Sequence, residues 1–138
     1  MPEKNFLAFD LGAESGRAVI GTLDGGKLSL KEIHRFANPT GRMNGHLHWN
    51  LLAQWEELKT GLRKAAASSA RIDGIGVDTW GVDFGLVGSD GEILGQPFHY
   101  RDTRTDGMMQ AAFDIVMREE IFAATGIQFM QLNSLYQF

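Results

Sequence analysis

The chain has 138 residues, of which 43% are hydrophobic and 22% charged, with a formal net charge of −4 and no cysteine. This length allows one domain with a core, and the composition is that of a folded rather than a disordered protein. The lack of cysteine excludes disulfides and thiolate metal sites, and the acidic balance argues against a nucleic-acid partner. No apolar run reaches the roughly 18 residues of a membrane span, and no signal-peptide pattern opens the chain, so we expect a cytoplasmic protein without membrane contact.

The first third of the sequence predicts three successive antiparallel strands. An apolar run ends at Asp10, which indicates a buried strand with a carboxylate at its tip. The dipeptide Gly25-Gly26 after Asp24 is a hairpin signal. The strands expected here are residues 6–9, 17–23 and 28–36. The polar segment that follows, residues 37–48, is predicted to be a loop.

A helix is expected next, with Asn50 as its N-cap. Apolar residues recur at helical spacing and predict the side of this helix that packs on the core. These residues are Leu51, Trp55, Leu58, Leu62 and Ala66. The remaining expected elements are a buried strand at 72–77, a short strand at 84–87 closed by a turn at 89–92, and helices at 108–117 and 119–124, the last ended by Gly126.

Residues 10–17, Asp-Leu-Gly-Ala-Glu-Ser-Gly-Arg, carry the first candidate site. Glycines in a tight turn can take positive φ and let backbone N–H groups face an anion. Ser15 and Arg17 could add donors, and Asp10 could orient a water molecule on Mg²⁺. The turn joins two strands, so it is neither a Walker loop nor a dinucleotide fingerprint, both of which open a helix. An ordinary glycine-containing hairpin fits the pattern equally well.

Two further polar clusters suit a hydroxyl-rich ligand. After the strand at 72–77, Gly81 would let backbone approach a ligand and Trp80 offers a face for a sugar ring; a buried aromatic is the alternative. Asp78 and Asp83 beside them could equally be turn formers or caps.

The other cluster, residues 100–105, is dense in donors and acceptors, although an exposed loop with a local Arg–Asp pair explains it too. Gln128, Gln131 and Asn133 could add neutral hydrogen bonds. His46 and His48 form a close pair without a third ligand at useful spacing, which favours a solvated loop over a metal site.

Taken in order, these segments resemble the FGGY carbohydrate kinases, and the match spans essentially the whole chain. The residues that carry it are 10–17, 32–36, 76–84, 100–105 and 126–129, with Asn133, Leu135, Tyr136 and Gln137. The resemblance implies an α/β fold, a ribonuclease-H-like mixed sheet of the actin/hexokinase ATPase superfamily. It implies that residues 1–138 form the first part of an N-terminal lobe, with the C-terminal lobe absent from these residues.

The same resemblance implies Mg²⁺–ATP-dependent phosphorylation of a sugar, L-rhamnulose, at its primary 1-hydroxyl. It assigns Ala13, Glu14, Ser15, Gly16 and Arg17 to the ATP-phosphate loop. It assigns substrate contacts to Gly81 and Trp80, and to Tyr100 and Arg101. Glu14 is an unusual neighbour for phosphate, and either points away from the nucleotide or acts through a cation.

No residue of this chain matches the aspartate that is the family's general base, so we expect residues 1–138 alone to be nearly inactive. Two alternatives stay open: a related kinase for another ketose, and a binding module that keeps a sugar or phosphate site without catalysis. Because the sheet would be cut short at an unpaired edge, we also expect these residues by themselves to associate or to be poorly stable.

Overall fold

The computed structural model describes residues 2–68 and 71–138, which divide into two compact units. Unit 1 combines the residues up to Pro39 with Asn50–Gly81, and unit 2 combines Thr40–Trp49 with Val82–Phe138.

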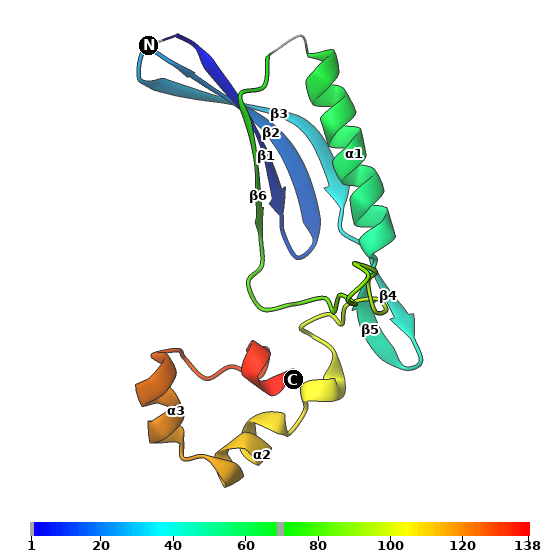
Figure 1. The fold of residues 1–138 in the computed structure, drawn as a ribbon, viewed down its shortest axis with the longest axis vertical. Coiled ribbons are helices and arrows are strands. Elements are labelled where there is room, and N and C mark those ends of the chain that lie inside the picture. The colour runs from blue at the N-terminus through cyan, green and yellow to red at the C-terminus, as the bar shows by residue number, and fades with distance from the viewer. Residues whose placement is uncertain (1, 69–70) are drawn as a thin grey trace. The chain divides into compact units, whose positions relative to one another are not determined.

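Unit 1 is built on a four-stranded mixed sheet in the order β3-β2-β1-β6 (Figure 1). Its strands are β1 Lys4–Leu11, β2 Ser15–Asp24, β3 Lys27–Ala37 and β6 Gly74–Thr79. The first three run antiparallel to one another, as predicted, and β6 lies parallel to β1. Gly25 and Gly26 take φ values of 54° and 84°, so the turn between β2 and β3 needs residues without a Cβ.

The core of unit 1 lies between one face of the sheet and helix α1, Leu51–Ala67 (Figure 1). Strands β1 and β2 alternate buried and exposed positions over most of their length, which is the period-2 pattern of a sheet covered on one side. The buried cluster consists of Leu7, Phe9, Ala18, Ile20 and Ala65. The Asn50 side chain caps the helix by accepting a hydrogen bond from the Ala53 N–H at 3.1 Å, which confirms the expected N-cap.

The prediction of which α1 residues pack on the core is wrong for most of them. Gln54, Gly61 and Ala65 are the buried residues, while Trp55 is 55% exposed. Of the predicted stripe, Leu58 packs against the core. The reason is close approach: a Cβ added at Gly61 would lie 2.6 Å from Phe9 Cε1, so the helix rests on the sheet through its small residues.

Unit 2 opens with a hairpin where a loop was expected. Strands β4 Thr40–Met43 and β5 His46–Trp49 pair antiparallel around Asn44 and Gly45, whose φ values are 53° and 85°. Asn-Gly between two short strands is a strong hairpin signal, and the many polar side chains around it hid that signal.

The rest of unit 2 is short helices and irregular chain. No strand forms at residues 84–87 within the described chain; a single bridge joins Val87 to Ile93 across the expected turn. A short apolar run becomes a strand only where a partner supplies a continuous ladder. Here two backbone hydrogen bonds flank the single bridge, from the Leu94 N–H to the Leu86 carbonyl and from the Gly88 N–H to the Glu92 carbonyl, and the pairing extends no further. The expected helices are present as α2 Met108–Ile115 and α3 Arg118–Thr125, and Gly126 ends α3 at φ 64°. Two 3-10 turns complete the unit, η1 Thr103–Thr105 and η2 Ser134–Tyr136.

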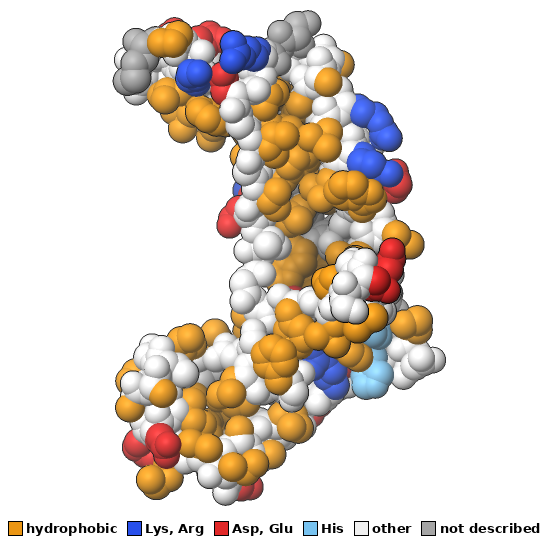
Figure 2. All heavy atoms as spheres, in the orientation of Figure 1, with side chains coloured by type: hydrophobic (Ala, Val, Ile, Leu, Met, Phe, Trp, Pro, Cys, Tyr) orange, Lys and Arg blue, Asp and Glu red, His pale blue; other side chains and the backbone are white. Residues whose placement is uncertain are grey.

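No helix within residues 2–68 and 71–138 has the length and apolar character to cross a membrane. Hydrophobic side chains nevertheless reach the surface of unit 1 between β6 and α1 (Figure 2). The strand expected at 72–77 forms as β6, but the prediction that it is buried is wrong. Ile75 and Val77 are 59% and 60% exposed, because α1 packs on β2 and β3 and β6 stands at the other edge of the sheet.

Candidate functional site

The connection between β1 and β2 holds the predicted phosphate loop. Ala13 and Glu14 lie in the turn, and Ser15, Gly16 and Arg17 open β2. The Glu14 side chain is exposed to solvent. All five residues therefore lie together at one end of the sheet, in a strand–turn–strand setting as predicted.

The glycines of this loop serve close packing rather than positive φ. Neither Gly12 nor Gly16 takes a positive φ, which corrects the expected reason for their presence. The Gly12 N–H donates to the Ser15 carbonyl at 3.0 Å. A Cβ added at Gly12 would also lie 3.0 Å from that oxygen, which is a tight contact. At Gly16 an added Cβ would overlap the ring of Phe36 on β3.

Asp10 and Arg17 form an ion pair across the β1–β2 ladder. They are register partners, and Arg17 Nε and Nη2 donate to Asp10 Oδ2 at 2.7 and 2.5 Å. Both side chains remain partly exposed. An exposed pair of this kind contributes little to stability, so an incoming phosphate can compete for the guanidinium.

A second carboxylate stands beside Asp10. Asp78 of β6 is its Cα partner in the parallel β1–β6 register, so both side chains leave the sheet on one face at the carboxyl ends of the strands. One or two carboxylates with water are what Mg²⁺ prefers, and this oxygen donor set fits that ion. Within the described residues no group of three or more His, Asp or Glu side chains could hold a metal ion directly.

A buried pair of side-chain amides behind the loop was not predicted from the sequence. Asn38 directly follows β3, and Gln54 lies in the first turn of α1. Gln54 Nε2 donates to Asn38 Oδ1 at 2.7 Å, and Asn38 Nδ2 donates to the Gly12 carbonyl at 2.8 Å. Gln54 lies one position before Trp55 of the expected apolar stripe, and nothing in the local pattern predicts its burial.

Trp80 and Gly81 follow β6 at the end of unit 1. Trp80 is half-buried, and Gly81 is exposed with open space where a Cβ would stand. This geometry leaves room for a ligand beside the Gly81 backbone, and the substrate contact assigned to Gly81 stays a prediction. Tyr100 and Arg101 belong to unit 2.

Tyr100 and Arg101 lie in an aromatic cluster of unit 2. The Tyr100 ring stacks on His99 with centroids 4.5 Å apart, and Arg101 Cζ lies 5.2 Å from the Tyr100 centroid. Asp83 Oδ2 accepts hydrogen bonds from the Trp49 indole N–H and from the Tyr100 N–H. Asp83 therefore joins strand β5 to the Tyr100 backbone, a long-range role beyond the turn or cap considered for it.

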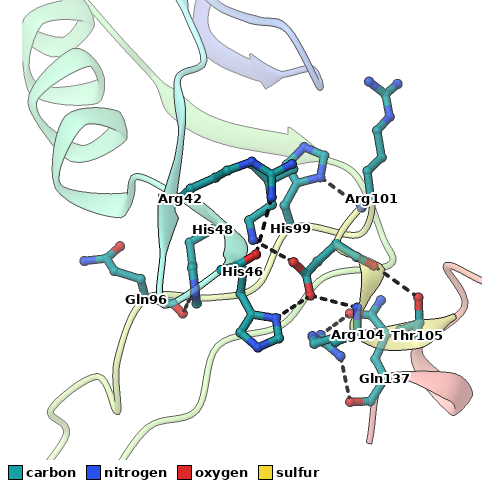
Figure 3. Close-up of polar contacts among 12 residues, drawn as sticks. Arg42, His46, His48, Gln96, His99, Arg101, Arg104, Thr105 and Gln137 are labelled. Carbon is teal, nitrogen blue, oxygen red and sulfur yellow. Dashed lines mark hydrogen bonds and ion pairs between the residues drawn. The ribbon is translucent and has the colours of Figure 1, made fainter.

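Figure 3 shows His46 and Arg104, two of the hydrogen-bond partners of Asp102. Asp102 is buried and bridges two segments, which corrects the expectation of an exposed loop with a local Arg–Asp pair. It accepts hydrogen bonds from the Leu47 N–H at 2.6 Å and from His46 Nδ1 and the Arg104 N–H, both at 3.0 Å. Burial alone would raise the pKa of Asp102, but these bonds, led by that of Leu47, hold it below its ordinary value. The charged carboxylate of Asp102 thus connects the β4–β5 hairpin by hydrogen bonds to the segment that includes Tyr100.

The histidine pair is also less solvated than expected. His48 is buried, and its Nδ1–H donates to the Gln96 carbonyl at 3.0 Å. His99 is buried as well, and its Nδ1 accepts from the Arg101 N–H at 3.0 Å. Burial lowers the pKa of His99, and the charge of Arg101 adds to this effect against the opposing carboxylates of Asp83 and Asp102.

An open pocket of about 500 Å³ adjoins this cluster. It is lined by Tyr100, Arg101, Asp102, Asp106, Gln131 and Leu132. Of the three amides singled out in the sequence, Gln131 thus lies beside Tyr100. The Asn133 side chain instead contacts the backbone of Gln128, since Asn133 Nδ2 donates to the Gln128 main-chain carbonyl at 2.8 Å.

Curated relatives match this chain along nearly all its residues. It is 45% identical to a rhamnulokinase of Bacteroides thetaiotaomicron over 135 residues, covering 98% of this chain and 28% of the relative. A rhamnulokinase of Pectobacterium carotovorum is also 45% identical, over 139 residues, 99% of this chain and 28% of the relative. The chain thus spans little more than a quarter of the length of these relatives. No family model matches it.

Solved structures of sugar kinases share the fold. Gluconate kinase of Lactobacillus acidophilus matches with a TM-score of 0.81 at 16% identity, covering 99% of this chain and 27% of that one. Xylulose kinase of the same organism matches at 0.79 and 17%, covering 97% and 27%. Plasmodium falciparum glycerol kinase, solved with ADP, matches at 0.75 and 15%, covering 97% and 28%. These likenesses confirm the expected α/β fold of the actin/hexokinase type.

Proposed function

We propose that the chain belongs to the FGGY carbohydrate kinases over the residues it spans, and that its protein phosphorylates L-rhamnulose at the 1-hydroxyl, using Mg²⁺–ATP, in the cytoplasm. The observation that carries this proposal is the 45% identity to rhamnulokinases across nearly the whole chain. Residues 1–138 would form the first part of the N-terminal lobe.

In this proposal the β1–β2 loop binds the nucleotide phosphates. Residues 13–17 form this loop, and its donors are backbone N–H groups of the turn, the Ser15 hydroxyl and the Arg17 guanidinium. Charge-assisted bonds from arginine to phosphate are among the strongest available. Mg²⁺, when bound, neutralises charge on the phosphates. Asp10 would hold it through water, with Asp78 beside it, as the donor set allows.

The sugar side is assigned to two places, each within its own unit. Gly81 offers exposed backbone and Trp80 a partly buried aromatic face. Tyr100 and Arg101 line an open pocket with hydrogen-bonding neighbours, which suits a polyhydroxylated ligand. None of these residues is assigned as general base, and we expect residues 1–138 alone to turn over little or no sugar.

Substrate-panel kinetics on the protein made from its complete reading frame test this proposal. We expect ATP-dependent phosphorylation with the highest kcat/KM for L-rhamnulose among rhamnulose, fuculose, xylulose and ribulose. A clear preference for xylulose or fuculose would reject the proposed substrate while keeping the kinase assignment. Binding of sugar or nucleotide without turnover would reject catalysis.

A charge-removing variant tests the phosphate loop directly. We expect Arg17→Met to raise the KM for ATP by about 10- to 100-fold, the equivalent of a charge-assisted hydrogen bond of about 1.5–3 kcal/mol. Arg63→Met, at an exposed position of α1, is the control and should leave that KM within about twofold. Equal effects of the two substitutions would contradict the assignment of Arg17.

A further inference from the structure

The carbonyl groups of the β1–β2 loop are held by one buried residue. Asn38 is 5% exposed. Its backbone N–H donates to the Glu14 carbonyl at 2.9 Å and its side-chain Nδ2 donates to the Gly12 carbonyl at 2.8 Å. The two carbonyls on either side of Ala13, those of Gly12 and Glu14, therefore both point toward Asn38.

This arrangement fixes where the loop's N–H groups point. In a trans peptide unit the N–H is directed opposite to the C=O. The Gly12 carbonyl shares its peptide unit with the Ala13 N–H, and the Glu14 carbonyl shares its unit with the Ser15 N–H. With both carbonyls turned toward Asn38, these two N–H groups are directed away from it, and an anion on that side would meet donors rather than carbonyl oxygens.

Gln54 holds the orientation of the Asn38 amide. Gln54 is 6% exposed, and its Nε2 donates to Asn38 Oδ1 at 2.7 Å. The Gly12 carbonyl can only accept, so the NH₂ of Asn38 faces Gly12 and its oxygen is left to accept from Gln54. Helix α1 begins at the end of the sheet that carries the β1–β2 loop (Figure 1), and the amide pair joins the two.

We propose that Asn38, oriented by Gln54, is a positioning residue that aims the N–H groups of Ala13 and Ser15 at the phosphates of a nucleotide. This inference rests on the proposed function. Asn38 itself does not touch the nucleotide. A buried polar network that is fully satisfied holds one geometry, and one broken at a single point leaves a buried group without a partner.

The test compares Asn38→Ala with Asn5→Ala in the protein made from its complete reading frame. Asn5 is a matched control because it is the same residue type, is 8% exposed, lies near the opposite end of β1 and also accepts a side-chain hydrogen bond, from Thr22 Oγ1 at 2.7 Å. We expect Asn38→Ala to raise the KM and Kd for Mg²⁺–ATP about tenfold, because a small misplacement of positioned groups weakens binding strongly. The KM for the sugar should change by less than about twofold in both variants, and the thermal midpoints should fall alike.

Gln54→Met is the second variant, in case Asn38→Ala does not fold. It keeps Asn38 and removes the bond to its oxygen, so we expect a smaller rise in the Kd for Mg²⁺–ATP, about threefold, with the sugar KM unchanged. If the wild type binds and uses ATP while the Asn38 and Gln54 variants match Asn5→Ala, this inference is wrong and the proposed function stands. If the wild type neither binds nor uses ATP, the proposed function fails, and this inference with it.

Discussion

Individual buried side chains hold the segment around Tyr100 in place. Asp83 accepts hydrogen bonds from the Trp49 indole N–H and the Tyr100 N–H, and Asp102 accepts one from the Leu47 N–H. Both carboxylates therefore connect β5 to residues 97–105 at points far apart in the sequence. A carboxylate in such a position is costly to bury but specifies one arrangement of its donors.

Asp102→Asn tests this role of the carboxylate. An asparagine side chain has one oxygen, so it cannot accept from the Leu47 N–H on one side and from His46 and Arg104 on the other. We expect the free energy of unfolding to fall by about 1–3 kcal/mol, the cost of leaving a buried donor without a partner. Chemical denaturation measures it, with exposed Asp114→Asn on α2 as the control, expected within about 0.5 kcal/mol of wild type. Equal values for the two variants would contradict the bridging role.

The buried His99 predicts an acid-side loss of stability. Its folded-state pKa lies below the ordinary value of about 6.5, so the unfolded chain takes up this proton first. The contribution of His99 is complete above about pH 6.5 and declines as the pH falls below it. We expect unfolding free energies measured between about pH 7 and 5 to decrease toward acid, and His99→Asn to flatten that slope. A slope unchanged by this substitution would show that His99 does not cause it.

At the scale of elements, α1 shows how close packing overrides an apolar stripe. The sequence places Trp55 and Leu62 at helical spacing, yet the helix meets the sheet through Gly61 and Ala65. Trp55 and Leu62 lie to the side, 55% and 37% exposed. Spacing predicted the helix itself, but which of its faces is buried depends on the shape of the sheet below it.

Gly61→Ala should therefore destabilise the protein although alanine is the better helix former. The new Cβ would lie 2.6 Å from Phe9 Cε1 and 3.0 Å from Ala18 Cβ. Overpacking of about 1–3 kcal/mol then exceeds the propensity gain of about 1 kcal/mol. Thermal or chemical unfolding measures the net loss. Ala66→Gly, at an exposed position, isolates the propensity effect and should cost about 1 kcal/mol. A stabilised Gly61→Ala variant would contradict the close contact.

At the scale of the whole molecule, strand β6 leaves an apolar edge. It is the last strand of the four-stranded sheet, and its apolar side chains Ile75 and Val77 are 59% and 60% exposed. An exposed apolar edge strand can pair with another chain, so residues 1–138 by themselves present a surface that favours association.

Val77→Lys should reduce that association, because a lysine on an edge strand opposes strand pairing. Sedimentation velocity of residues 1–138 at rising concentration measures it. Leu52→Lys is the control, since Leu52 is 71% exposed but lies on α1, whose backbone hydrogen bonds are internal. We expect the average mass of the wild type to rise with concentration, and that of Val77→Lys to rise less than that of Leu52→Lys. A wild type that stays monomeric throughout the range would contradict the expectation.

The sequence by itself determined the three antiparallel strands, the Asn50 cap, the final helices and the strand–turn–strand setting of the phosphate loop. Each follows from neighbours in the chain: alternation, helical spacing, and turn residues such as Gly25-Gly26. The predicted roles of Ala13 to Arg17, and of Gly81 and Tyr100, remain predictions; of these positions Gly16 is buried and the others are at least partly exposed.

The tertiary structure decided the rest. The buried face of α1, the burial of Asp102, and the Asn38–Gln54 support of the loop all depend on partners distant in sequence. A polar residue is buried only where such a partner satisfies it. No local pattern around Asn38 or Asp102 carries that information, because most of the hydrogen-bond partners that make their burial possible come from segments distant in the sequence.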